Sequence, residues 1–302
     1  MPPTLSSLTR ELESIRKQIR LRAAPATSPV LDALRADHTL PMRAIGLTPD
    51  PWQRDLILAP DKQVAALCTR RSGKTQTVAS RITARSLTIP RRKTLIFAPT
   101  EDQSKELLQY VREMNDALGC PVPVESETES RVRWANGSEV KAKTDKPKSS
   151  RGFTPDEIVI DEAAQVSDLL YLTVAPMQIL GKCDVMALTT PFGKMGWFYE
   201  LWNTPAKARQ WRQFKVTAYD CPRIDRATLE THRAVLPPAW FDQEYMCVFN
   251  NTSGAVFDRE TLEACVTSDD LYAPLDLSPC TSSSGTTSGR LKTRRRCAPS
   301  SG

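Results

Sequence analysis

Residues 63–88 have the sequence QVAALCTRRSGKTQTVASRITARSLT, and this stretch decides the fold. It begins with an apolar run typical of a buried strand and ends with the spacing of a helix. Between them lies Gly73-Lys74-Thr75, which matches the end of the phosphate-loop pattern G-x-x-x-x-G-K-[ST]. The first glycine of that pattern is replaced by Cys68, and Arg70 and Arg71 follow. We therefore predict a strand, a variant phosphate-binding loop and a helix.

Strand-like and helix-like segments alternate beyond this stretch. An amphipathic helix is predicted at 101–119, and a β-hairpin with Asn136-Gly137 in a type I′ turn is predicted at 131–144. Further apolar strands are predicted at 93–100, 156–163, 183–191 and 212–220. Because these strands are too apolar to have an exposed face, we expect an α/β fold with a mainly parallel sheet flanked by helices.

The chain divides by composition into five segments. Leu5, Leu8, Leu12, Ile15 and Ile19 form the stripe of an N-terminal amphipathic helix, which packs on the main domain or serves as a partner helix. A proline-containing linker is expected to follow it, and the end of the chain is Ser/Thr/Gly-rich, then basic, and is expected to be disordered. The predicted segments are a helix at 1–24, a linker at 25–44, an α/β core with the phosphate loop at 45–205, a small C-terminal subdomain at 206–276 and a tail at 277–302.

The net charge of +6 comes almost entirely from the end of the chain. Residues 280–302 carry five basic side chains and no acid, so the other 279 residues carry 36 basic and 35 acidic groups. Net charge therefore gives no argument for nucleic-acid binding. No apolar run approaches the roughly 20 residues that span a bilayer. We therefore expect no membrane segment. The eight cysteines form no C-x-x-C pair, so we expect no zinc site. With no secretion signal at the N-terminus, we expect a cytoplasmic protein.

The chemistry of the phosphate loop follows from its residue types. A loop at a helix N-terminus presents backbone N–H groups to an anion, and we expect Arg71, Ser72 and Gly73 to take part in this. Lys74 would place its charge on the β and γ oxygens of a nucleoside triphosphate, and the Thr75 hydroxyl would bind Mg²⁺.

A second element, DEIVIDEA at 156–163, is an apolar strand that ends in Asp161-Glu162. Asp161 would hold the water shell of Mg²⁺, and Glu162 would act as the general base for the attacking water. Upstream, the amide of Gln53 would contact adenine, while Trp52 covers the base or packs in the core. The combination predicts a nucleoside triphosphatase that uses ATP and Mg²⁺.

These motifs, in their order, resemble the large terminase subunits of tailed bacteriophages over residues 46–260. The segments that carry the resemblance are PWQRDLI (51–57), CTRRSGKT (68–75), IFAPTEDQSKELL (96–108), WANGSEVKA (134–142), SSRGFTPDEIVIDEAAQV (149–166) and ALTTPFGKMGWFYELW (187–202). The resemblance implies a RecA-like ATPase of the ASCE type that packages double-stranded DNA. It also implies a homo-oligomeric ring, or a monomer in solution, together with a portal on the procapsid, a small terminase subunit and a place in the host cytoplasm.

The resemblance also suggests roles for single residues. Arg70 matches a phosphate-loop arginine that stabilises charge in the transition state, whereas Arg71 binds phosphate or faces solvent. Thr189 and Thr190 match a segment that couples loss of the γ-phosphate to DNA movement, or they simply end a strand. Arg151-Gly152 matches a loop that contacts nucleotide or DNA, and a solvated basic loop is the alternative.

The C-terminal region departs from the family. Many large terminases continue into a nuclease domain, and none is expected here, because Asp269, Asp270 and Asp276 have no strand framework around them. The composition of the tail suggests a shifted reading frame or a shortened gene. Two other functions are open: a helicase-like translocase, although no second α/β core follows Thr190, and a catalytically silent remnant that binds DNA or a partner.

Overall fold

The computed structural model describes residues 28–144, 154–178 and 183–250. The chain divides into two units after residue 256, and all of the described residues belong to the first. The predicted N-terminal helix, the tail at 277–302 and the loop residues Arg151 and Gly152 lie outside the described residues. Among the described residues, no helix is both long and apolar enough to cross a membrane.

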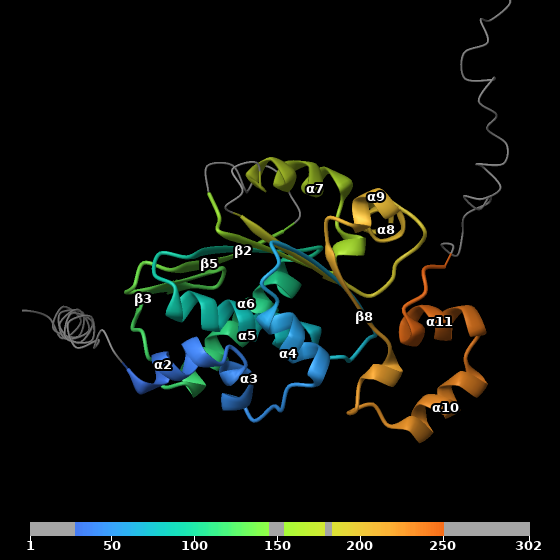
Figure 1. Cartoon of the computed structure of the whole chain (residues 1–302), viewed down its shortest axis with the longest axis horizontal. Coiled ribbons are helices and arrows are strands. Elements are labelled where there is room, and N and C mark those ends of the chain that lie inside the picture. Colours follow the sequence, from blue (N-terminus) through green and yellow to red (C-terminus); the bar gives the residue numbers. More distant parts are fainter. Residues whose placement is uncertain (1–27, 145–153, 179–182, 251–302) are drawn as a thin grey trace, which may run out of the picture. The chain divides into compact units, whose positions relative to one another are not determined.

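Eight strands in the described part of the chain form one mixed sheet (Figure 1). Their order is β3-β4-β5-β2-β6-β7-β1-β8, and the five pairings from β5 to β8 are all parallel, whereas β3 and β4 pair antiparallel. The prediction of a mainly parallel α/β sheet is confirmed. The strands are β1 (Gln63–Cys68), β2 (Lys93–Ala98), β3 (Val124–Thr128), β4 (Arg131–Trp134), β5 (Glu139–Thr144), β6 (Glu157–Asp161), β7 (Asp184–Thr189) and β8 (Arg212–Val216).

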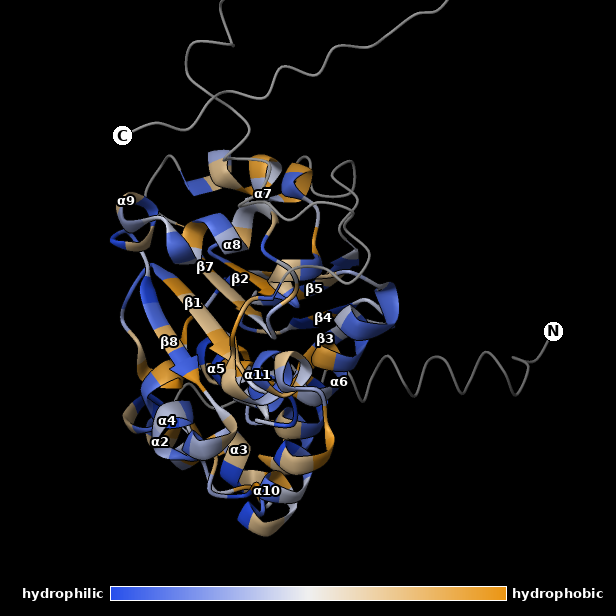
Figure 2. Cartoon of the chain, turned by 90° about the vertical axis from the view of Figure 1, so that its right-hand side faces the viewer, coloured by the Kyte–Doolittle hydropathy of each residue, from blue (hydrophilic) through white to orange (hydrophobic). Residues whose placement is uncertain are grey.

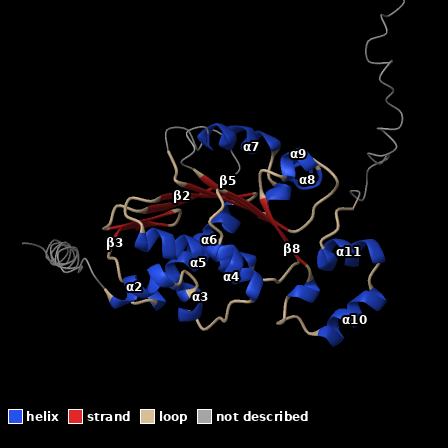
Figure 3. Cartoon of the chain, viewed as in Figure 1, coloured by secondary structure: helices blue, strands red, loops and turns tan. Residues whose placement is uncertain are grey.

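Helices cover both faces of this sheet (Figure 3). Helices α4 (Pro51–Leu58), α5 (Lys74–Thr88) and α6 (Glu101–Ala117) pack on one face. The opposite face is covered by α7 (Asp168–Val174) and α8 (Gly196–Asn203), near the short segments η2 (Ala163–Gln165), η3 (Ala175–Gln178) and α9 (Pro205–Ala208). Each face of the sheet therefore contributes to its own hydrophobic core.

Alternation along the strands builds these two cores. Ala66 of β1 and Val159 of β6 point into the core beside α5, while their neighbours Leu67 and Ile160 point into the core beside α7 and α8. All four side chains are fully buried. Successive side chains of a strand point to opposite faces, so a strand buried on both faces needs a continuous apolar sequence. Figure 2 shows this as hydrophobic residues along the central strands.

Two short helices correct the prediction of a linker at 25–44. Residues Pro29–Ala36 form α2 and Leu40–Ala44 form α3, and both contain a proline in the first turn. Leu34 and Met42 are fully buried in the core beside α5. A proline is compatible with the first turn of a helix because the N–H groups there have no intrahelical partner. From residue 28 onward this segment is part of the folded core.

The start of the predicted C-terminal subdomain also needs correction. Strand β8 begins at Arg212 and pairs in parallel with β1, so it belongs to the main sheet. After it, η4 (Ala218–Asp220), α10 (Arg226–Val235) and α11 (Pro238–Met246) form a small cluster around Leu229 and Phe241. We call residues 218–246 the α10–α11 unit. It lies near the end of β8 (Figure 1).

The predicted hairpin at 131–144 is present, but its turn is not of type I′. Gly137 has a φ of 84°, whereas Asn136 is not among the residues with positive φ. Asn136 instead accepts a hydrogen bond from the backbone of Ser138 and donates one to the carbonyl of Ser86. The bond to Ser86 connects the turn to the end of α5, a contact that the local turn sequence does not contain.

Candidate active site

The predicted phosphate loop connects the end of β1 at Cys68 to the start of α5 at Lys74. Arg71 and Gly73 both have left-handed backbones, with φ values of 61° and 83°. Alternating left-handed and right-handed residues turn successive backbone N–H groups toward one concavity, which is a common way to bind an anion. Cys68 is fully buried in the core, and burial raises the pKa of its thiol. The position where the usual pattern has glycine therefore accepts a side chain in this protein.

Gly73 is required by both its conformation and its surroundings. A Cβ atom at this position would lie 3.0 Å from Nε2 of Gln53 and 3.1 Å from a guanidinium nitrogen of Arg223. The left-handed φ adds strain for any residue other than glycine. Two side chains from distant segments thus pack directly against the loop.

Gln53 supports the phosphate loop through hydrogen bonds from its side-chain amide. Its side chain is fully buried, and Nε2 donates to Thr77 Oγ1 at 2.9 Å and to the Ser72 carbonyl at 3.3 Å. Its Oε1 accepts from the backbone N of Asp50 at 2.8 Å. These bonds occupy both ends of the amide. Adenine contact by Gln53 stays a prediction, and it requires the amide to leave these partners.

Glu162 joins the phosphate loop to the end of β7. Its Oε1 accepts from Lys74 Nζ at 2.6 Å, and its Oε2 accepts from the backbone N of Thr190 at 3.2 Å. The hydroxyls of Thr189 and Thr190 each lie 3.3 Å from the same Oε2. The structure thus brings together four residues that the sequence analysis had assigned separate roles: a phosphate ligand, a base and two coupling hydroxyls.

Lys74 supplies positive charge next to the carboxylates of Glu162 and Asp161. Burial alone would lower the pKa of Lys74, but the carboxylates of Glu162 and Asp161 outweigh it and raise the pKa above its ordinary value. Burial, together with the charge of Glu162, raises the pKa of Asp161 to about 6, although Lys74 opposes this shift. At neutral pH the lysine is therefore charged and Asp161 is largely ionised.

Thr75 and Asp161 supply oxygen ligands of the kind that Mg²⁺ prefers. Asp161 is the last residue of β6 and is buried, and its Oδ1 accepts from the adjacent backbone N of Glu162 at 3.0 Å. Thr75 lies in the first turn of α5, is half-buried and lines the cavity at the loop. A buried carboxylate with remaining acceptor capacity and a threonine hydroxyl in the phosphate loop are both groups that suit a hard divalent cation.

A cavity of about 310 Å³ opens at this loop. Five of its lining residues, Ser72, Gly73, Lys74, Thr75 and Arg71, were predicted to bind nucleotide. Arg223, Leu47, Gln76, Glu106 and Tyr110 complete the wall. Leu47 and Tyr110 form an apolar part of the lining, beside the basic side chains of Arg71, Lys74 and Arg223.

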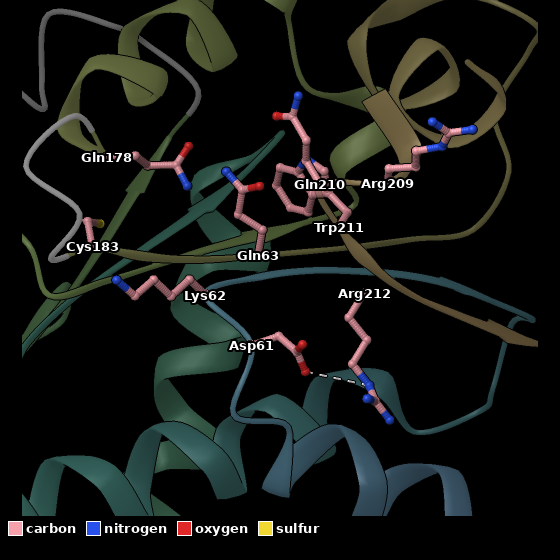
Figure 4. A pocket seen from close by; sticks show the side chains of 9 residues that line it. All are labelled: Asp61, Lys62, Gln63, Gln178, Cys183, Arg209, Gln210, Trp211 and Arg212. Carbon is pink, nitrogen blue, oxygen red and sulfur yellow. Dashed lines mark ion pairs between the residues drawn. The ribbon is translucent and has the colours of Figure 1, made fainter. Parts of the chain in front are cut away.

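The described residues also line a larger cavity, of about 570 Å³, away from this loop (Figure 4). Gln63 and Arg212 are the first residues of β1 and β8, so this cavity lies at the amino ends of the parallel strands. Arg212 pairs with Asp61 there at 3.6 Å. Ligands of open α/β sheets bind at the carboxyl ends of the strands. For this reason we place the candidate active site at the smaller cavity.

Arg70 points away from the loop cavity in this structure. Its Nε forms an ion pair with Glu244 of α11, and its backbone N donates to the Glu244 carbonyl at 3.3 Å. The role of Arg70 at phosphate therefore stays a prediction, and it requires the guanidinium to leave Glu244.

Two residues of this site were missed by sequence reasoning. Arg223 donates to the Ser72 carbonyl at 2.7 Å and to Asp50 Oδ2 at 3.0 Å, and Glu244 binds Arg70. Both come from the segment after β8, 150 or more positions from the loop. No local motif marks either residue, and only the parallel pairing of β1 with β8 brings this segment to the loop.

A family model matches residues 66–264, which is about two thirds of the chain, and its description is "Terminase large subunit, T4likevirus-type, N-terminal". The chain belongs to the terminase large subunit family. The match begins within β1 and includes the phosphate loop, Asp161-Glu162 and Thr189-Thr190. The resemblance seen in the motifs is thus confirmed.

Solved structures of terminases share the fold. The Thermus phage P74-26 large terminase ATPase domain aligns with a TM-score of 0.60 at 21% identity, over 69% of this chain and 97% of that domain. The large terminase of a thermophilic bacteriophage aligns at 0.59 and 12% identity over 70% of this chain, and that of bacteriophage HK97 at 0.54 and 15% over 72%. This chain spans only 57% and 54% of those two proteins.

The thermophilic phage terminase has also been solved in complex with ADP and with ATP-γ-S. No curated protein matches the sequence. At these identities the solved structures establish the fold, a sheet and flanking helices like those of terminase ATPase domains.

Proposed function

We propose that this chain hydrolyses ATP to ADP and phosphate and uses the energy to translocate double-stranded DNA into a phage capsid. The observation that carries the proposal is the contact set of Glu162, which joins Lys74 of the phosphate loop to Thr190 at the end of β7. Membership of the terminase large subunit family supports the packaging role. The nucleotide complexes of a structural neighbour support ATP as the substrate.

The phosphate loop binds the triphosphate in this proposal. Backbone N–H groups around Gly73 and the ammonium of Lys74 contact the β and γ oxygens, because the cavity places them on one side. Thr75 and Asp161 would hold Mg²⁺, which supplies positive charge to the phosphate oxygens when bound. The apolar side of the cavity, at Leu47 and Tyr110, suits the nucleoside.

Glu162 acts as the general base. In the present geometry Lys74 occupies one of its oxygens, so triphosphate binding has to draw the lysine toward phosphate first. The freed carboxylate then accepts a proton from a water that attacks the γ-phosphorus, while the bond to the β–γ bridging oxygen breaks and ADP leaves. The raised pKa of Lys74 keeps this lysine charged at neutral pH.

Coupling runs through the other oxygen of Glu162. The hydroxyl and backbone N of Thr190 both contact it, so a change of charge or position at the carboxylate is felt at the end of β7. The coupling role assigned to Thr189 and Thr190 is therefore a contact of the base itself in our proposal. Loss of phosphate would reset the Lys74–Glu162 pair and shift this strand end.

The remaining parts of the motor are proposed from family membership. They are a homo-oligomeric ring on the procapsid portal, a small terminase subunit as partner, and a site of action in the host cytoplasm. Each of these concerns molecules beyond this chain.

ATP hydrolysis, measured with and without double-stranded DNA, tests the proposal. Glu162→Gln should lower kcat by about 10²–10⁴-fold while ATP binding persists. Glu113→Gln on the exposed side of α6 removes the same charge and should leave kcat unchanged. Hydrolysis that survives Glu162→Gln would exclude Glu162 as the base. Absence of hydrolysis in the wild-type chain under all DNA conditions would favour a catalytically silent remnant.

A further inference from the structure

The side-chain amide of Gln53 is engaged at both ends by the protein itself. Its Oε1 accepts from the backbone N of Asp50 at 2.8 Å. Its Nε2 donates to Thr77 Oγ1 at 2.9 Å and to the Ser72 carbonyl at 3.3 Å. Gln53 is fully buried, so moving its amide to a ligand would leave buried polar groups without partners, which is costly. These contacts favour a structural role for Gln53 in the loop.

A second glutamine, Gln76, lines the phosphate-loop cavity itself, whereas Gln53 does not. Gln76 is the third residue of α5, directly after Lys74 and Thr75, and is partly buried. Among the residues that the structure describes, its side-chain amide has no hydrogen-bond partner. An amide carries both donors and an acceptor, so Gln76 brings unused hydrogen-bonding capacity of both kinds into the cavity.

The apolar residues beside Gln76 suit a planar base. Tyr110 and Leu47 line the same cavity, and both pack against the core beside α5, which fixes their positions. An aromatic ring stacks on any base, because every base has a π face. Tyr110 and Leu47 therefore provide contact area without selecting one base, and selection is left to the polar side chains of the wall.

The polar side chains of this wall differ in what they can recognise. Arg71 and Arg223 only donate hydrogen bonds, and the carboxylate of Glu106 only accepts them. The N6/N7 edge of adenine carries a donor beside an acceptor, which a glutamine amide matches with two hydrogen bonds. Gln76 is the glutamine that the cavity offers to this edge.

We propose that Gln76, and not Gln53, recognises the base of the bound nucleotide. Its amide forms two hydrogen bonds with the N6/N7 edge of adenine, while the ring of Tyr110 stacks on the base. Gln53 keeps its contacts to the loop throughout. The inference rests on the proposed ATPase function, because it needs a nucleotide at the phosphate loop.

Calorimetric titration of the Gln76→Leu variant with ATP-γ-S and with GTP-γ-S tests this inference. Leucine is similar in size but cannot form hydrogen bonds. The ratio of ATP-γ-S to GTP-γ-S affinity should therefore fall about tenfold, which corresponds to about 1.4 kcal/mol. GTP-γ-S affinity should hardly change, and in ATP hydrolysis KM should rise with little change in kcat. Gln76→Ala should give the same result, so the test does not depend on one variant.

Three further variants make the test specific. Gln109→Leu removes an amide from the exposed side of α6 and should leave both affinities unchanged. Gln53→Leu removes contacts of the loop, so it should lower both affinities by the same factor and leave their ratio unchanged. Tyr110→Leu should also lower both affinities, because stacking does not depend on the identity of the base.

The outcomes separate this inference from the proposed function. If Gln76→Leu lowers both affinities equally or changes neither, Gln76 does not recognise the base and the inference is wrong. A ratio that falls in Gln53→Leu and not in Gln76→Leu would also refute it. Equal affinity of the wild-type chain for both nucleotides would refute the inference and leave the ATPase function standing. If the wild-type chain binds neither nucleotide, the proposed ATPase function fails, and the inference fails with it.

Discussion

Glu157, the first residue of β6, lies at the centre of a buried cluster of charges at the amino ends of the strands. Arg81 Nε is 3.1 Å from its Oε1, Arg85 is 2.7 Å from the same atom, and Arg92 is 3.4 Å from Oε2. Asp184 adds a second carboxylate 3.0 Å from Arg85 and from Arg92. The side chain of Glu157 is 1% exposed. Replacing it with glutamine keeps the shape and removes the charge that balances the three arginines.

The expected loss can be worked out from the pKa of Glu157. Burial opposes ionisation, but Arg85, Arg81 and Arg92 outweigh it and lower the pKa from 4.5 to about 2. A pKa lowered this far corresponds to about 3 kcal/mol of stabilisation at neutral pH. Removing one partner of a buried ion pair typically costs about 3–5 kcal/mol. Glu157→Gln should therefore lower the free energy of unfolding by about 3 kcal/mol at pH 7.

The effect has a defined pH dependence. Because the folded pKa is below the unfolded value of 4.5, the stabilisation is complete above about pH 5.5 and is lost as the pH falls toward 2. The difference between wild type and Glu157→Gln should shrink to about 1 kcal/mol at pH 3.

Urea unfolding followed by circular dichroism from pH 7 down to the lowest pH at which both proteins fold measures this difference. Glu113→Gln, on the exposed side of α6, is the charge-matched control and should change stability by less than about 0.5 kcal/mol. A difference below about 1 kcal/mol at pH 7, or one that grows as the pH falls, would show that the three arginines do not stabilise the ionised form of Glu157.

Three further predictions concern the site and the core. Gly73→Ala should abolish most nucleotide binding in calorimetry and destabilise the fold by about 1–3 kcal/mol, because the left-handed φ is strained for alanine and its Cβ would crowd Gln53 and Arg223; unchanged affinity would contradict this. Thr190→Val should lower kcat about tenfold with little change in KM, through the lost hydroxyl contact to Glu162; an equal rise in KM would assign Thr190 to binding. Leu34→Ala should cost about 2–5 kcal/mol in urea unfolding, and a neutral result would remove α2 from the core.

The sequence was sufficient for the elements that have a strong period. The apolar run at 63–68 is β1 within the predicted limits, and the helix predicted at 101–119 is α6, Glu101–Ala117. The parallel sheet followed from strands with no polar face. At the candidate site, Lys74, Asp161 and Glu162 could be proposed from the sequence because the phosphate loop and the strand before a carboxylate pair are local patterns. Local patterns are decided by neighbouring residues, so one sequence is enough to find them.

Other features depend on contacts that no local pattern contains. Helices α2 and α3 are short and have prolines in their first turns, so their sequence resembles a linker, whereas burial of Leu34 and Met42 in the core beside α5 stabilises them. The amide of Gln53 is used by the loop, because the chain returns to within hydrogen-bond distance of it. Arg223 is brought to Ser72 by the pairing of β8 with β1.

The phosphate loop is held from three directions, and this arrangement has a mechanical consequence. Gln53 binds it from α4, Glu162 binds it from β6, and the α10–α11 unit binds it through Arg223 and Glu244. The contact of Gln53 is buried and neutral, whereas Glu162 forms an ion pair whose cation, Lys74, is a natural ligand of phosphate. An incoming triphosphate would therefore compete with Glu162 for Lys74 and leave the Gln53 contact in place. The loop would keep its shape while Glu162 loses its lysine and keeps its contacts to Thr189 and Thr190, so triphosphate binding would act on the end of β7 through this carboxylate.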